Sequence, residues 1–139
     1  MNGVTVFTPT YNRGYILSNA YKSLQRQSLT NFEWFIIDDA SEDNTEELVT
    51  NWLKEVNSFH INYHRFKNGM GKHRALDYAC SYAENEAILI LDSDDYLLDD
   101  AIEWVINNFS RIVGGGEILW HERTESAQGY VIIGRSRLL

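Results

Sequence analysis

Apolar residues form short runs that alternate with helical stripes along most of the chain. The runs cover residues 4–8, 34–37, 61–66 and 87–91, and each has the length and composition of a buried strand. Between the runs, apolar residues recur three and four positions apart, which predicts amphipathic helices. The stripes comprise Ile16, Leu17, Ala20 and Leu24; Leu48, Val49, Trp52, Leu53 and Val56; Ala75, Leu76, Ala79, Cys80 and Ala83; and Ile102, Val105, Ile106 and Phe109.

This alternation of strands and helices predicts an α/β fold. Strands joined by right-handed helical crossovers pair in parallel, so we expect a Rossmann-like, mostly parallel sheet with helices on both faces. Apolar and polar positions alternate in 118–121 and 130–133, which predicts a hairpin or an antiparallel edge at the C-terminal end. No Gly-, Ser- or Pro-rich stretch marks an internal boundary. Residues 1–139 are therefore expected to form a single domain.

Charge and composition narrow the class of partner. The formal net charge of −8 argues against a nucleic-acid binder, because such proteins present a basic face to the phosphate backbone. An anionic substrate would need a cation to bridge it to this protein. The only cysteine, Cys80, cannot form an internal disulfide and is expected to be a structural thiol in a helix.

No stretch approaches the roughly 20 apolar residues of a membrane span, and the first residues lack the basic and apolar regions of a signal peptide. We expect a cytoplasmic location, with peripheral attachment to the inner membrane face as an alternative.

The candidate chemistry follows the predicted strands, where open α/β sheets bind their ligands. The strongest signal is at 92–95, where Asp92, Asp94 and Asp95 surround Ser93 directly after an apolar run. Gathering like charges is costly unless a cation compensates. Mg²⁺ typically takes one or two carboxylates together with phosphate oxygens, so the motif favours a divalent cation site. Alternatively, Asp94 and Asp95 open a solvated turn and cap the next helix.

Two other segments carry polar residues at the same edge. Asp38 and Asp39 end the second apolar run, and one of these carboxylates could accept hydrogen bonds from a base or a ribose. Capping of the next helix by Asn44 or Thr45 is the alternative for this segment, although it does not explain Asp38.

The segment 69–74 combines permissive glycines with positive charge just before a helix, which suits a diphosphate. It lacks the third glycine of a dinucleotide fingerprint and the Lys-Ser/Thr pair of a P-loop. For His73, a ligand role and a plain surface position are equally open. His60 and His64 are expected to be structural, because no third ligand is near them in the sequence.

Together these motifs resemble glycosyltransferase family 2, whose members have the A-type nucleotide-diphospho-sugar transferase fold. The resemblance covers nearly the whole chain and is carried by 8–13, Gln27, 33–45, 68–75 and 91–95. It implies that Asp38 or Asp39 contacts the base, commonly uracil. It also implies that Asp92 lies near the ribose, that Asp94 holds Mn²⁺ or Mg²⁺, and that Asp95 shares either role. The other substrate-binding residues implied by the resemblance are Pro9, Thr10, Tyr11, Arg13, Gly71, Lys72, Arg74 and Ser93.

By this resemblance the protein would be a metal-dependent, inverting glycosyltransferase of cell-surface polysaccharide synthesis. It would move a sugar from a nucleotide-diphospho-sugar donor, a UDP-sugar, to a hydroxyl of a glycan, lipid-linked or protein acceptor. The Asp or Glu that acts as general base in this family is expected beyond Leu139, so we expect a C-terminally truncated domain. A non-catalytic nucleotide-sugar-binding module is the main alternative. A nucleotidyltransferase is a weaker one, because its first loop is usually Gly-rich and 8–13 contains no glycine.

Overall fold

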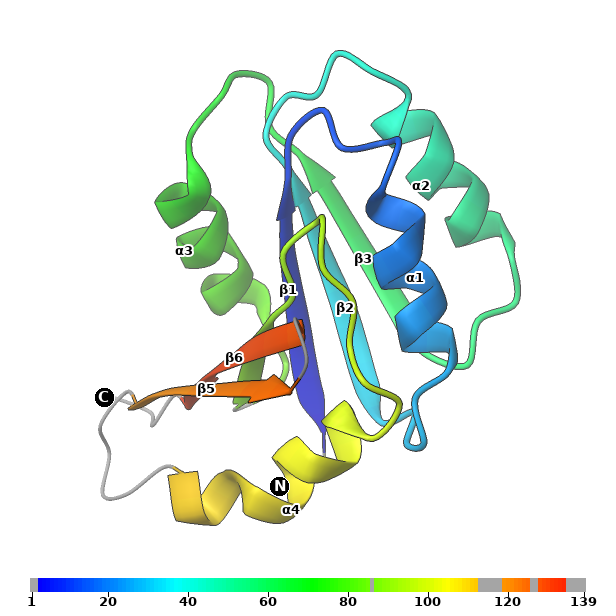
Figure 1. Ribbon diagram of the computed structural model, residues 1–139. Coiled ribbons are helices and arrows are strands. Elements are labelled where there is room, and N and C mark those ends of the chain that lie inside the picture. Colours follow the sequence, from blue (N-terminus) through cyan, green and yellow to red (C-terminus); the bar gives the residue numbers. More distant parts are fainter. Residues whose placement is uncertain (1–2, 86, 113–118, 126–127, 135–139) are drawn as a thin grey trace.

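Six strands form one mixed sheet in the order β3-β2-β1-β4-β6-β5 in the computed structural model, which describes residues 3–85, 87–112, 119–125 and 128–134 (Figure 1). The strands are β1 Val4–Thr10, β2 Phe32–Asp38, β3 His60–Arg65, β4 Ala87–Ile90, β5 Leu119–Glu125 and β6 Gln128–Gly134. The helices are α1 Leu17–Gln25, α2 Thr45–Lys54, α3 Lys72–Tyr82 and α4 Ala101–Ile112.

The first four strands pair in parallel and the last two are antiparallel, as the hydrophobic pattern predicts. β1 lies between β2 and β4, and β3 pairs with the outer side of β2. β5 and β6 form the expected hairpin, with β6 antiparallel to β4 and β5 at the edge. Of the residues predicted for this hairpin, Ile118 lies outside the described part of the chain.

Helices cover both faces of the sheet, and each face has its own apolar cluster. Alternate strand residues such as Val6, Trp34 and Leu89 face α1, α2 and α4, while Phe7 and Ile37 face α3 (Figure 1). Because both faces are buried, the strands read as continuous apolar runs and not as alternating ones. Within the described residues, no helix is long and apolar enough to cross a membrane.

The pairing of β1 with β4 ends just before Pro9, at the edge of the sheet where ligands are expected. The Leu91 N–H donates to the Phe7 carbonyl oxygen at 2.8 Å, and the registered pairing of the two strands ends with Phe7 and Ile90. Pro9 has no N–H with which to continue this ladder. The strand order reverses at β1, with β2 on one side and β4 on the other, so a crevice is expected here.

Candidate functional site

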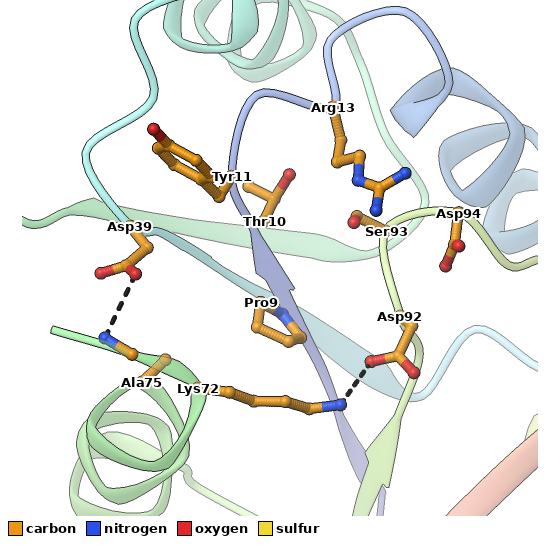
Figure 2. A pocket seen from close by; sticks show the side chains of 11 residues that line it. Pro9, Thr10, Tyr11, Arg13, Asp39, Lys72, Ala75, Asp92, Ser93 and Asp94 are labelled. Atoms are coloured by element: carbon orange, nitrogen blue, oxygen red, sulfur yellow. Dashed lines mark hydrogen bonds and ion pairs between the residues drawn. The ribbon is translucent and has the colours of Figure 1, made fainter. Parts of the chain in front are cut away.

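A cavity of about 320 Å³ opens at the carboxyl ends of β1 and β4, a volume in the range of small-molecule sites (Figure 2). Four segments contribute to it: the end of β1 with its loop, the residue after β2, the start of α3, and the loop after β4. The lining residues are Pro9, Thr10, Tyr11, Arg13, Asp39, Gly71, Lys72, Ala75, Asp92, Ser93 and Asp94.

The acidic loop after β4 forms one wall of this pocket. The Asp95 N–H donates to the Asp92 carbonyl oxygen at 3.0 Å and closes a turn in which Ser93 is buried and Asp94 is exposed. Helix α4 begins only at Ala101, so capping by Asp94 or Asp95 is wrong as an explanation of this motif. Across the pocket, the Lys72 Nζ lies 2.9 Å from Asp92 Oδ1.

Negative charge exceeds positive charge in this loop, which makes it suitable for a cation. Burial and the charges of Asp94 and Asp92 raise the pKa of Asp95, and Lys72 offsets this only in part. Within the described residues, no three His, Cys, Asp or Glu side chains are grouped as a metal site. Asp92 and Asp94 line the pocket and could each supply a carboxylate ligand, and the other ligands would be phosphate oxygens or water, as is usual for Mg²⁺.

The Thr10 hydroxyl is a buried polar group in the wall of the pocket. Its side chain lines the pocket with a residue exposure of 3%, and its Oγ1 has no hydrogen-bond partner among the described residues. Buried hydroxyls normally have a partner, because leaving one unpaired costs free energy.

The two aspartates at the end of β2, Asp38 within the strand and Asp39 directly after it, occupy different environments. The carboxylate of Asp39 lines the pocket and accepts hydrogen bonds from the Met70 and Gly71 N–H groups at 2.6 and 3.2 Å. Asp38 is fully buried and is not among the lining residues. It accepts hydrogen bonds from the Tyr63 hydroxyl at 2.5 Å and from the Ser41 N–H at 2.9 Å. Asp39, and not Asp38, is thus the carboxylate available to a base or ribose in the pocket.

Helix α3 begins at the pocket with Gly71 in a conformation (φ 85°, ψ 163°) that is essentially restricted to glycine. Lys72 and Ala75 both line the cavity, because residues three apart share a helix face. Arg74 is exposed and does not line it, since two residues turn a helix by about 200°. Ala75 was not predicted, and its spacing from Lys72 is the only sequence signal that could have found it.

Asp95, Cys80 and the histidines His60, His64 and His73 do not line the pocket. Asp95 contributes to the loop but is not among the lining residues, and exposed His73 is not among them either. The His64 ring stacks on Tyr78 with centroids 4.1 Å apart, and the His60 Nε2 lies 3.1 Å from Asn62 Oδ1. Cys80 is half-buried on α3 against the apolar cluster of that face.

The cap of α2 differs from the prediction. Asn44 occupies the N-cap position but makes no hydrogen bond with its side chain there. Instead, Asp43 Oδ1 accepts hydrogen bonds from the N–H and the hydroxyl of Thr45 at 3.0 and 2.5 Å, and its Oδ2 accepts one from the Gly14 N–H. The carboxylate therefore fixes the start of α2 and also ties it to the loop after β1.

The parallel part of the sheet, the pocket where the strand order reverses and the acidic loop opposite Lys72 define an α/β domain with a polar pocket at the carboxyl ends of its strands. The sequence model of glycosyl transferase family 2 matches residues 5–121, and the chain belongs to this family.

Two relatives whose names state an activity illustrate the likeness. The GalNAc(5)-diNAcBac-PP-undecaprenol beta-1,3-glucosyltransferase of Campylobacter jejuni is 35% identical over 106 residues, covering 73% of this chain and 33% of that protein. The UDP-Glc:alpha-D-GlcNAc-diphosphoundecaprenol beta-1,3-glucosyltransferase WfgD of Escherichia coli is 31% identical over 121 residues, covering 84% of this chain and 46% of that protein.

Solved structures confirm the A-type fold. Residues 1–349 of Staphylococcus aureus TarS in complex with UDP superimpose with a TM-score of 0.71 at 20% identity, covering 92% of this chain and 46% of that one. The mannosyltransferase PcManGT of Pyrobaculum calidifontis, in complex with GDP-Man and Mn²⁺, gives a TM-score of 0.63 at 27% identity, covering 67% and 28%. The chain spans less than half the length of each of these relatives.

Proposed function

We propose that this chain is the donor-binding domain of a metal-dependent, inverting glycosyltransferase that uses a UDP-sugar. The observation that carries the proposal is the pairing of the acidic loop, with Asp92 and Asp94 in the pocket wall, with Lys72 on the opposite side. The relatives named for UDP-Glc and for undecaprenol-linked substrates support a UDP-sugar donor and a lipid-linked glycan acceptor of the bacterial cell surface. A cytoplasmic location would suit such a donor.

Several of the lining residues then have roles that their chemistry allows. Asp39 would accept a hydrogen bond from the base. Asp92 would lie near the ribose, and the Lys72 ammonium would approach the diphosphate as a charge-assisted donor. A divalent cation held by Asp94, with Asp92 beside it, would neutralise charge on the departing diphosphate.

The acceptor hydroxyl also needs a general base, because an alcohol is a weak nucleophile. No pocket carboxylate is free for this task in our assignment, so we place the base outside residues 1–139. Steady sugar transfer from UDP-glucose by this chain alone would contradict that placement. Donor binding without transfer is also what a non-catalytic binding module would show, and sugar transfer by a longer protein that contains this chain would separate the two.

Calorimetry with UDP and GDP, each with and without Mn²⁺, tests the donor site. We expect UDP to bind in a metal-dependent manner and Asp94→Asn to lose that dependence. Asp77→Asn is the matched control, because Asp77 is an exposed carboxylate on α3 that does not line the pocket. Failure of the folded wild-type protein to bind UDP would overturn the proposal, and so would equal losses in the two variants.

A further inference from the structure

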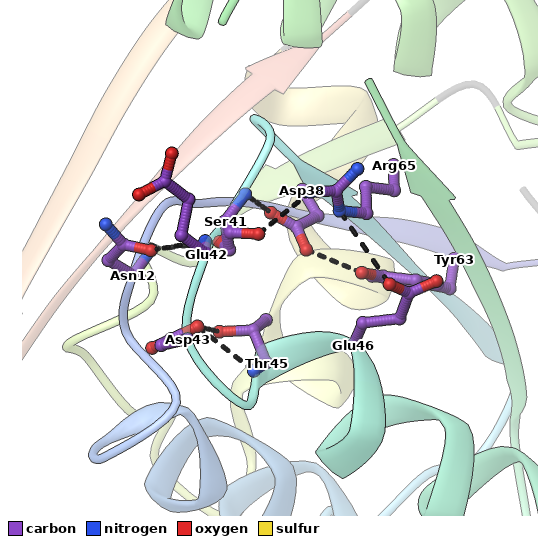
Figure 3. A network of polar contacts seen from close by, with 9 residues as sticks. All are labelled: Asn12, Asp38, Ser41, Glu42, Asp43, Thr45, Glu46, Tyr63 and Arg65. Atoms are coloured by element: carbon purple, nitrogen blue, oxygen red, sulfur yellow. Dashed lines mark hydrogen bonds and ion pairs between the residues drawn. The ribbon is translucent and has the colours of Figure 1, made fainter. Parts of the chain in front are cut away.

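Behind the pocket, a chain of hydrogen bonds joins the outermost parallel strand to the loop after β1 (Figure 3). The Tyr63 hydroxyl on β3 donates to Asp38 Oδ2 at 2.5 Å, and Asp38 Oδ1 accepts from the Ser41 N–H at 2.9 Å. The Ser41 Oγ in turn accepts from the Asn12 N–H at 2.9 Å. None of these four residues is among those that line the pocket.

The chain of contacts reaches two positions with unusual backbone. Asn12 has φ 50° and Ala40 has φ 65°, which is the left-handed region that residues with a Cβ rarely adopt. Such conformations persist only where the surrounding structure holds them. Asn12 stands between Tyr11 and Arg13, and Ala40 follows Asp39, so each left-handed residue is next to residues of the pocket wall.

Further contacts hold the same two loops together. The Glu42 N–H donates to the Asn12 side-chain oxygen at 2.8 Å, so Asn12 bonds the β2 loop through both its backbone and its side chain. The Arg65 guanidinium donates to the Ser41 carbonyl oxygen at 2.9 Å. The backbone of this segment is therefore fixed from β3 as well as from the loop after β1.

We propose that Tyr63, Asp38 and Ser41 are positioning residues of the donor site. They hold the left-handed turns at Asn12 and Ala40, and these turns aim Tyr11, Arg13 and Asp39 at the nucleotide. Burial, together with the hydrogen bond to Asp38, raises the pKa of Tyr63, so its hydroxyl keeps the proton that it donates. This inference rests on the proposed function, because it takes a nucleotide as the ligand.

The test compares two tyrosines with similar bonds in different places. The Tyr21 hydroxyl donates to Glu55 Oε2 at 2.9 Å and also lies 2.6 Å from Asn57 Oδ1, away from the pocket. Tyr63→Phe and Tyr21→Phe each remove a hydroxyl that donates to a carboxylate. We expect UDP affinity in Mn²⁺ to fall about three- to ten-fold in Tyr63→Phe, the equivalent of one net hydrogen bond, and to stay unchanged in Tyr21→Phe.

Ser41→Ala breaks the chain at a second point and keeps the inference testable should Tyr63→Phe fold poorly. It should lower UDP affinity by a similar factor, and the double variant Tyr63→Phe/Ser41→Ala should lose less than the product of the two factors, because both act through one network. Wild-type affinity in Tyr63→Phe and Ser41→Ala, or an equal loss in Tyr21→Phe, would overturn the inference.

Amide hydrogen exchange separates this inference from the proposed function, since it needs no ligand. Exchange at the Asn12 and Ser41 N–H groups should accelerate in Tyr63→Phe but not in Tyr21→Phe. Faster exchange in a protein that does not bind UDP would mean that the positioning network exists and that the nucleotide assignment is wrong. Unchanged exchange would overturn the network itself.

Discussion

Replacing Lys72 with alanine should separate ligand binding from stability. The Lys72 Nζ lies 2.9 Å from Asp92 Oδ1, and the two side chains are 58% and 43% exposed. An ion pair so exposed contributes about 0–1 kcal/mol, so Lys72→Ala should lower the free energy of unfolding by no more than about 1 kcal/mol. A hydrogen bond from a charged donor to a diphosphate is worth about 1.5–3 kcal/mol. UDP affinity should therefore fall by about 10- to 150-fold.

Calorimetry with UDP and with uridine, at one Mn²⁺ concentration, measures this effect. Uridine carries no diphosphate, so its affinity should be the same in Lys72→Ala and in the wild type. Arg74→Ala is the matched control, because Arg74 is a neighbouring cation on α3 that does not line the pocket. Added salt should reduce the difference between Lys72→Ala and the wild type, since it screens charge.

Two results would refute this reasoning. Equal losses of UDP and uridine affinity would mean that Lys72 acts on the nucleoside through Asp92 and not on the diphosphate. An equal loss in Arg74→Ala would mean that the general positive charge at the start of α3 matters, and not the position of one ammonium group.

Three further predictions concern stability and are checked by urea unfolding. Gly71→Ala should lower the free energy of unfolding by about 1–3 kcal/mol, because φ 85° with ψ 163° is essentially a glycine conformation. The loss would come from the backbone alone, since an added Cβ would meet nothing within 4 Å. Unchanged stability would mean that the start of α3 relaxes freely. Trp34→Phe should lower the free energy of unfolding by about 1–3 kcal/mol, since it removes the 2.8 Å hydrogen bond from the indole N–H to the buried Thr8 hydroxyl. An unchanged free energy of unfolding would mean that this hydrogen bond does not stabilise the fold. Burial opposes ionisation of Asp43, but hydrogen bonds from Thr45 and Gly14 outweigh it and lower its pKa. The stability that Asp43 contributes relative to Asp43→Asn is thus present above pH about 4 and should shrink as the pH falls further, so a difference that grows with acidity would contradict the assignment.

The hydrophobic pattern predicted the elements and their class, but not the order of the strands. Apolar runs and helical stripes are local features, so they located β1 to β4 and the helices between them. The hairpin was also predicted, because β5 and β6 are neighbours in the sequence. Its pairing with β4 depends on contacts between Ala87–Ile90 and residues more than 40 positions later, which no local pattern encodes.

The rule that open α/β sheets bind ligands at the carboxyl ends of their strands was enough to predict most of the residues that line the pocket. It gave the loop after β1, Asp39, the start of α3 and the acidic loop, which the structure brings together. It could not orient side chains within a helix whose first residue was unknown. Arg74 was included because of its charge, and Ala75 was left out because an alanine carries no polar signal.

The two aspartates at the end of β2 show what information is needed to tell a pocket residue from a buried one. Along a strand, successive side chains point to opposite faces, so Asp38 shares the face of Ile36 and Asp39 the face of Ile37. Ile36 belongs to the cluster under α1 and α2, and Ile37 to the cluster under α3. Tyr63 is registered with Ile36, which brings its hydroxyl to Asp38. Asp39 instead points toward the residues that lead into α3 and so reaches the pocket. Because both faces of this strand are apolar, the sequence holds no marker of which face is which, and the assignment becomes possible only when the positions of the helices are known.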